Sequence, residues 1–591
     1  MRQLFNTLSA FLLILAISTE IAIAQKDSTV LNQSVEVMKA YHPSISNAKK
    51  ISLMPVIDDT TRYSPEFIYS IDSKPIRSGF TASSIKPADV NKESYKDLGL
   101  GYLKLGAGTS TTAYGEFFLN LPQSKNATFG LHLRHLSSDG TIKLAAGDKV
   151  NAPFSQNNAA ISSSLDIGNT VLTTDLSYDR DAVNYYGYPA AIPAKIDTIS
   201  SIRYGLKQVY EKGDLRVALK SIEKNQGNLV FNSGIRLGFF DSKTGQKEAS
   251  GGFFGKFDYN FGQVHGILDL AYDHYSTDSI TLEKTQLPGT KNEDWIRIAP
   301  SVRLNGDNWS LRGGINFVSS AEKSEGSTTK LYPDFDFNFR PVEGILTLYA
   351  GLKGDLRNNC YGDIALGNYW SDPRHNIHST DYNYVVTGGL KGKISRELSY
   401  NLGVTFSQVK NMYFYTQKSY FTSSSNPLIY ISDPLNYSNE FGVVYNNAKI
   451  TDFSAEFSYV SGKDLSVVLK GNYYNYKLDV LTFAPQKPNF ILSAFASVRI
   501  LDKLTGFADL DVIGNRKAQV FNINPFASPV SRDQVMQIDP SIQLNLGATY
   551  ELTHNFKLFG RVDNLLNRPN EQWLGYASQG LRLMGGATIS F

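Results

Sequence analysis

The chain has 591 residues and a net charge of +3, and its 19% of charged residues is below the quarter that soluble domains usually carry. No strongly basic region points to nucleic acid, so we predict no nucleic-acid partner. The one cysteine, Cys360, excludes an intrachain disulfide and a cysteine cluster for zinc. The 34 tyrosines, 34 phenylalanines and 47 glycines favour a strand-rich chain with aromatic girdles.

The N-terminus has the pattern of an export signal. Arg2 gives a positive start, residues 10–17 form an apolar core, and Ala22 and Ala24 form a small-x-small cleavage pattern. We predict a signal peptide over residues 1–24, with Gln25 as the first residue of the exported chain. A membrane anchor is the alternative, but a spanning helix needs about 20 apolar residues and this run is shorter.

Residues 25–97 differ from the rest of the chain. They contain five prolines and show little sustained alternation of apolar and polar residues. We predict a mostly irregular N-terminal periplasmic arm, in which residues 35–38 form at most one strand. Two interpretations remain open, because an ordered arm needs compensating contacts: a disordered tail, or a segment that fills a lumen or docks a partner.

From residue 98 to the C-terminus, apolar residues alternate with polar or small ones. Over residues 542–552, for example, Leu544 and Leu546 share one face and Gln543 and Asn545 share the other. A period of two predicts strands, and these segments exceed the average of about 5–6 residues for soluble strands. No later stretch approaches the roughly 20 apolar residues of a membrane helix. A membrane location therefore requires a closed barrel, which satisfies every backbone hydrogen bond in lipid.

The connections between these segments alternate in length. Short turns such as 168–169 and 305–307 lie between long polar loops such as 358–382 and 567–579. Short turns at one rim and long loops at the other are typical of outer-membrane barrels. We therefore predict an all-β fold, a transmembrane antiparallel β-barrel of about 22 strands. The predicted strands are 98–108, 111–122, 126–137, 156–167, 169–181, 201–223, 228–241, 247–261, 263–276, 292–304, 308–320, 329–341, 344–357, 383–395, 398–414, 437–461, 464–478, 487–501, 503–516, 536–552, 556–566 and 580–591.

One long loop gathers residues that suit a metal. Asp372, His375, His378 and Asp381 lie within ten residues, and imidazoles with carboxylates bind zinc, copper or iron. The alternative is a solvated extracellular loop, because the spacing matches no established metal motif. We predict no metal site and no cofactor, and these four residues are the only metal candidates.

Two further interpretations concern aromatic clusters and catalysis. The clusters at 413–415 and 473–476 lie near predicted strand ends, where aromatic belts at the membrane interface are expected. The chain has no nucleophile motif and no Ser/His/Asp set that spacing can bring together. We therefore predict that the protein is not an enzyme.

The end of the chain resembles the TonB-dependent receptor family of outer-membrane barrels, in a form similar to barrels of Bacteroidota. The match is specific over roughly the last 35 residues. Leu566 stands where the family usually has Phe, and Leu581 separates the usual Gly and Arg. The residues that carry the resemblance are 559–567 (FGRVDNLLN), Glu571, Gly575, Tyr576, Gly580, Leu581, Arg582 and the terminal Phe591.

The resemblance implies a multi-pass protein of a Gram-negative outer membrane that takes part in transport. Family members carry a plug of more than about a hundred residues before the barrel, whereas residues 25–97 provide 73 and contain no convincing energy-coupling motif. We therefore expect a plugless barrel whose transport is passive or gated by a separate component. The alternative is a non-transporting barrel subunit of an outer-membrane assembly or surface-binding complex. Expected partners are outer-membrane lipid, a periplasmic or surface lipoprotein, and the barrel-insertion machinery during assembly.

Overall fold

The computed structural model describes residues 100–591, apart from residues 125, 145–146, 148, 188–206, 223–228, 279–280, 283–284, 287–291, 323–325, 373–376, 420–436, 463 and 522–533. The predicted signal peptide (1–24) and N-terminal arm (25–97) lie outside the described residues. Within the described part of the chain, no helix is long and apolar enough to cross a membrane.

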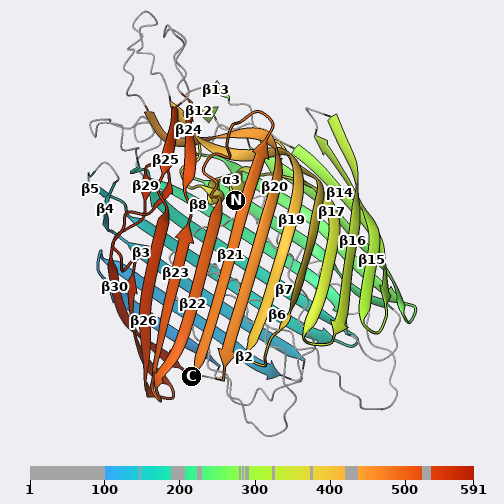
Figure 1. Ribbon diagram of the computed structural model, residues 1–591, viewed down its shortest axis with the longest axis horizontal. Helices are drawn as coiled ribbons and strands as arrows, with labels where there is room; N and C mark the ends of the chain where they lie inside the picture. Colours follow the sequence, from blue (N-terminus) through green and yellow to red (C-terminus); the bar gives the residue numbers. More distant parts are fainter. Residues whose placement is uncertain are drawn as a thin grey trace, which may run out of the picture.

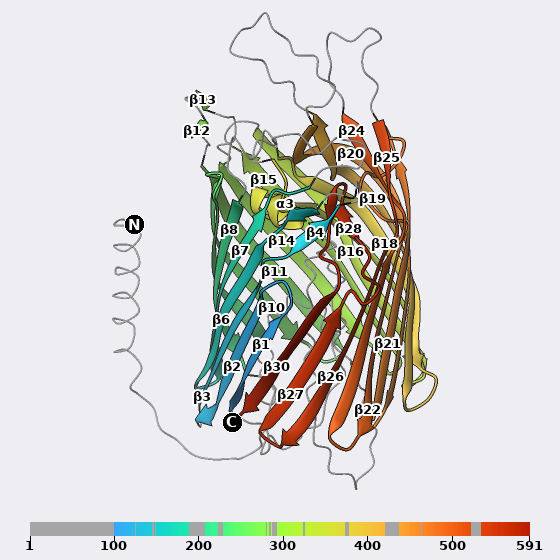
Figure 2. The same ribbon diagram turned by 90° about the vertical axis from the view of Figure 1, so that its left-hand side faces the viewer.

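Twenty-two strands form a closed antiparallel barrel, seen in two views in Figure 1 and Figure 2. The ring closes where β1 pairs with β30, with Tyr102 opposite Ser590 and Gly108 opposite Met584. Each predicted strand corresponds to one observed strand in the same order. The barrel strands are β1 (Gly101–Gly108), β2 (Thr112–Ser124), β3 (Ala127–Ser138), β6 (Phe154–Ile167), β7 (Thr170–Asn184), β8 (Lys207–Ser221), β9 (Leu229–Ser242), β10 (Lys247–Asn260), β11 (Val264–Thr277), β14 (Asn292–Asn305), β15 (Trp309–Glu322), β16 (Gly326–Val342), β17 (Leu346–Arg357), β18 (Thr380–Lys393), β19 (Leu398–Ser419), β20 (Tyr437–Ser461), β21 (Leu465–Leu478), β22 (Phe490–Leu501), β23 (Leu504–Ile513), β26 (Ser541–Thr553), β27 (Phe556–Asp563) and β30 (Arg582–Ser590).

Smaller elements lie in the connections between barrel strands. They include one helix, α3 (Tyr361–Gly367), and the short strands β4 (Thr141–Lys143), β5 (Lys149–Asn151), β12 (Thr281–Leu282), β13 (Thr285–Gln286), β24 (Arg516–Phe521), β25 (Gln534–Ile538), β28 (Glu571–Trp573) and β29 (Tyr576–Ala577). The β24–β25 hairpin extends the sheet, because β24 pairs in parallel with the end of β19 at Gln417 and Lys418.

The two faces of each barrel strand have different chemistry. In β26, Leu546, Tyr550 and Leu552 are exposed on the outer face, whereas Gln543 and Asn545 are buried on the lumen side. Exposed apolar side chains recur on strand after strand around the barrel. A wall that is apolar outside and polar inside suits a hydrocarbon surrounding, as the alternation predicted.

The two rims of the barrel also differ. The C-terminus and tight turns such as the one at Gly168, whose φ is +61°, lie at one rim (Figure 2). Connections of up to 27 residues, the length of 514–540, lie at the other. By the rule for outer-membrane barrels, the short-turn rim is periplasmic and the long-loop rim is extracellular.

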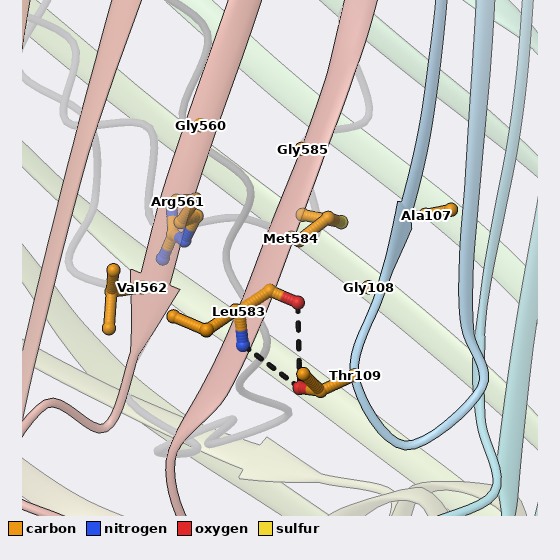
Figure 3. Close-up of a pocket in the computed structure, with 9 residues that line it drawn as sticks. All are labelled: Ala107, Gly108, Thr109, Gly560, Arg561, Val562, Leu583, Met584 and Gly585. Carbon is orange, nitrogen blue, oxygen red and sulfur yellow. Dashed lines mark hydrogen bonds between the residues drawn. The ribbon is translucent and has the colours of Figure 1, made fainter.

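The closing seam carries a shallow groove on its outer face (Figure 3). Its volume is about 510 Å³, and its lining includes Gly560 and Gly585, which project no side chain. The hydroxyl of Thr109 accepts a hydrogen bond from the Leu583 N–H at 3.0 Å, and the Thr109 N–H donates to the Leu583 carbonyl at 2.8 Å. These bonds join the β1–β2 turn to β30 at the extracellular end of the seam.

Two of the predicted polar loops are not solvated loops. Residues 358–379 contain α3, in which Tyr361, Ile364 and Leu366 are buried, and residues 564–581 contain the buried β29. Both views place α3 inside the outline of the barrel near the extracellular rim (Figure 1 and Figure 2). The polar-loop prediction was wrong for these segments, because apolar residues within them pack against each other in the lumen.

Candidate functional site

A cluster of apolar and aromatic side chains bridges the lumen at its extracellular end. We call it the mouth cluster, and we call residues 358–379 the mouth loop. Two of the contributing strands, β8 and β19, are separated by eight strands in one direction around the ring and twelve in the other. The cluster therefore joins well-separated walls of the barrel. Its buried members are Val183, Tyr185, Tyr210, Phe240, Tyr361, Ile364, Ala365, Leu366, Tyr369, Trp370, Tyr415, Phe441, Ala518, Ile538, Leu574 and Tyr576.

The helix α3 is fixed at its first turn by a carboxylate from the wall. Glu248 on β10 accepts hydrogen bonds from the N–H groups of Tyr361 at 2.6 Å and Gly362 at 2.9 Å. These N–H groups lack partners within a helix, and a carboxylate also complements the positive helix end. A β-carbon on Gly362 would lie 3.0 Å from the Phe240 ring, so glycine permits this close approach.

On one wall, the mouth loop is bound to β7 and β8. The Tyr210 hydroxyl donates to the Tyr369 carbonyl at 2.6 Å, and the Tyr369 hydroxyl donates to the Asp181 carboxylate at 2.8 Å. The Trp370 indole N–H donates to the Asn184 carbonyl at 2.9 Å. Polar tips of buried aromatic residues normally need such partners, so these bonds set the orientation of the rings.

On the facing wall, the mouth loop is bound to β19 and β20. The Tyr415 hydroxyl donates to the Ile364 carbonyl at 2.7 Å. The Phe441 N–H donates to the Trp370 carbonyl, and the Asp372 N–H donates to the Phe441 carbonyl, both at 2.9 Å. We predicted that residues 413–415 form an interface belt, but Tyr415 lies in the mouth cluster and faces the lumen.

The hairpin β28–β29 covers the mouth loop. Tyr576 stacks on Trp370 with ring centroids 3.9 Å apart, and the Tyr186 hydroxyl donates to the Ala577 carbonyl at 2.9 Å. Arg516 on β24 donates to the carbonyls of Gln572 and Glu571. Burial raises the pKa of Glu571 to about 7, although the Gly575 N–H and the Arg516 guanidinium act in the opposite direction. The hairpin therefore contains a carboxyl group that titrates near neutral pH.

The candidate metal ligands do not form a centre among the described residues. Asp372 and Asp381 are buried, which contradicts the solvated-loop interpretation at these positions. The Asp381 carboxylate accepts from the Tyr332 hydroxyl at 2.7 Å and lies 3.6 Å from the Lys330 ammonium. The His378 ring packs against the Tyr445 ring, and His375 lies outside the described residues. In the described part of the chain, no three His, Cys, Asp or Glu residues are placed to hold a metal ion.

The C-terminal motif has a structural explanation. The Asp563 carboxylate at the end of β27 is held by Arg561 at 2.5 Å and by Arg582 of β30 at 2.7 Å, and all three side chains are buried. Asn564 and Asn567 both have a φ of +49°, a conformation that Asn tolerates better than most residues. The motif thus joins the last two strands and turns the chain toward the β28–β29 hairpin.

Comparisons with known proteins show the fold. No family model and no curated protein matches the sequence. The structure is similar to the FpvA receptor of P. aeruginosa (12% identity, 83% of this chain and 71% of that chain, TM-score 0.59) and to the FrpB iron transporter of Neisseria meningitidis (11%, 84% and 82%, 0.61). It is also similar to the ferric-catecholate import receptor Fiu of E. coli (9%, 83% and 81%, 0.58). Two of these proteins are described as an iron transporter and an import receptor. The chain is therefore a multi-pass outer-membrane β-barrel with a TonB-dependent-receptor-like fold.

Proposed function

We propose that this protein transports a solute across the outer membrane through a gated lumen, with the mouth loop as the gate. The observation that carries this proposal is the mouth cluster, in which side chains from well-separated walls meet on the mouth loop. An open, passive pore needs a wet, polar passage. Packed aromatic rings across the mouth favour a gated passage over a permanently open one.

The fold supports transport as the broader function. The similar structures include an iron transporter and an import receptor. The lumen wall of this chain is polar, as a passage for a hydrophilic solute requires. Oppositely charged side chains are in contact on this wall. Arg312 and Asp334, for example, lie 2.8 Å apart.

The mouth loop suits a gate because its attachments are separate from those of the barrel wall. The wall is held by strand-to-strand hydrogen bonds, whereas the mouth loop is held by side chains and a few backbone bonds. Loops that move in function are drawn from the less stable parts of a structure. A partner or ligand that displaces the loop would open the mouth without breaking the barrel.

A separate protein component is the proposed trigger of this opening. A periplasmic or surface lipoprotein fits this role, and the arm over residues 25–97 is the proposed segment for docking or for filling the lumen. A sealed barrel subunit of a larger assembly is the competing function, because a closed mouth serves it equally well. The two functions differ in one respect: in a transporter the mouth loop is displaced during operation, whereas in a sealed subunit it stays in place.

The test is a liposome-swelling assay on the purified mature chain and on a variant with a Gly/Ser linker in place of residues 361–370. We expect no swelling with the unaltered protein and rapid entry of a sugar with the variant. A control variant carries a linker in place of residues 480–483, which are not members of the mouth cluster. A variant that stays impermeable while its barrel is folded, shown by heat-modifiable electrophoretic mobility, would overturn the proposal, because the mouth loop would not be the segment that closes the lumen.

A further inference from the structure

A second feature of the lumen lies directly against the mouth loop. A cavity of about 1220 Å³, partly open to its surroundings, lies between residues 357–363 and the wall strands β8 to β11, β14, β15 and β17. We call it the lumen cavity. Typical ligand sites enclose about 300–1,000 Å³, so this space accommodates a solute of a few hundred daltons.

The described lining of the lumen cavity has an excess of negative charge. Six carboxylates face four basic side chains, which leaves a formal charge of −2 with His378 neutral. The carboxylates belong to Asp214, Glu248, Asp273, Glu293, Asp355 and Asp363, and the basic groups to Lys212, Arg236, Arg297 and Arg357.

Each of the four basic side chains already lies against a carboxylate of the same lining. Lys212 lies 3.5 Å from Asp214, Arg236 is paired with Asp273, and Arg297 and Arg357 lie 2.7 Å and 3.8 Å from Asp355. The negative excess therefore resides on the remaining carboxylates, Glu248, Glu293 and Asp363. Of these, Glu248 accepts from the α3 N–H groups and Glu293 accepts from the Trp295 indole at 3.1 Å.

Asp363 is the most accessible of these three acids. It lies in the first turn of α3, it is exposed, and it has no ion pair with any described residue. The partly exposed ring of Tyr275 also contributes to the lining, whereas Trp295 and Tyr361 in the same lining are buried. A carboxylate together with aromatic rings is a combination that attracts ammonium groups, through Coulomb attraction and the negative faces of the rings.

We propose that the lumen cavity binds a small organic cation, a solute that carries an ammonium group. The carboxylate of Asp363 receives the ammonium group, and the aromatic lining contacts its carbon atoms. An anion would be repelled by the negative excess, and a neutral solute would gain no Coulomb attraction from it. Because Asp363 belongs to the mouth loop, a cation bound here contacts the gate itself. The inference thus rests on the proposed gated function and adds the class of solute.

The test measures binding, separately from transport. Purified mature protein in lipid nanodiscs is titrated with three tripeptides that are acetylated at the N-terminus and amidated at the C-terminus, Ala-Lys-Ala, Ala-Gln-Ala and Ala-Glu-Ala, so that only the lysine peptide carries an ammonium group, and isothermal titration calorimetry measures binding. We expect the lysine peptide to bind about tenfold more tightly than the glutamine peptide, because a charge-assisted hydrogen bond replaces a neutral one. The glutamate peptide should bind most weakly.

A variant localises the effect. Asp363→Asn should weaken binding of the lysine peptide about fivefold and leave binding of the glutamine peptide unchanged. The control, Asp502→Asn, makes the same change on an exposed periplasmic turn and should have no effect. Equal binding of all three peptides by the unaltered chain, or no binding at all, would overturn the cation proposal and leave the gate intact. Preferential cation binding in a chain that never conducts would instead overturn the gate and leave the cation site.

Discussion

The lumen wall and the mouth cluster lie in the same barrel but are built from opposite chemistry. The wall holds charged side chains in contact, such as Lys470 with Glu456 at 2.9 Å, on strands that are hydrogen-bonded to both neighbours. The buried members of the mouth cluster are all uncharged, and they meet across the lumen from segments far apart in the ring. The difference places stability in the wall, and it is the basis for our proposal that the mouth supplies control. Changes in each should therefore have separable effects.

The largest expected effect is on the wall. Asp563→Asn removes the carboxylate shared by Arg561 and Arg582 and leaves buried guanidinium groups with too little negative charge. Breaking a buried ion pair costs roughly 3–5 kcal/mol. Thermal unfolding in detergent should show a large loss of barrel stability, whereas the exposed Asp502→Asn should show none. If the two variants unfold alike, the C-terminal motif does not stabilise the closing strands.

In the mouth, Trp370→Ala should cost about 3 kcal/mol of packing energy, because it removes the stack on Tyr576 and the bond to Asn184. Barrel unfolding should be unchanged, since no strand pair is lost. Protease cleavage within the mouth loop should become faster. The matched control is Trp309→Ala at the periplasmic end of β15, which should leave cleavage at its original rate. Loss of barrel stability in Trp370→Ala would contradict the separation of wall and mouth.

A smaller effect is expected for Glu248→Gln. The amide keeps the size of the side chain but weakens the two bonds to the N–H groups of Tyr361 and Gly362. Hydrogen bonds to charged groups contribute about 1.5–3 kcal/mol, so the first turn of α3 should exchange its amide hydrogens about tenfold faster. Glu551→Gln, near the periplasmic end of β26 beside Lys557, is the control and should leave that exchange unaltered. Unchanged protection in Glu248→Gln would show that the carboxylate does not hold the helix.

The smallest effect concerns pH. The pKa of Glu571 is raised to about 7 from its ordinary value of 4.5, so its stabilising contribution is fully present below pH 4.5 and is lost as the pH rises through 7. The β28–β29 hairpin should dock more weakly at pH 8 than at pH 5, by about 1–2 kcal/mol. Acrylamide quenching should increase with pH in a chain that has Trp295 and Trp309 replaced by Phe and keeps Trp573 of the hairpin and Trp370 beneath it. In Glu571→Gln the pH dependence should vanish, and its persistence would assign it to another group.

The strand pattern was predictable because lipid imposes it. An outward apolar residue is needed at every second position, so the alternation predicted all 22 strands in order, including the 25-residue β20 as one continuous strand. The mouth cluster was missed because its contacts join distant parts of the chain. A local signal was present: Tyr361, Ile364 and Ala365 have the spacing of a helix face, with Tyr369 and Trp370 close behind. Because polar residues surround these five, the whole segment was interpreted as a polar loop.

Single-channel conductance in a planar bilayer tests the central claim most directly. The mature chain and the variant with residues 361–370 replaced by a Gly/Ser linker are compared at the same protein density. A closed mouth predicts that the unaltered chain is silent and that the variant shows large, steady conductance steps. Large steps from the unaltered chain, or silence from a folded variant, would contradict the assignment of the mouth loop as the gate.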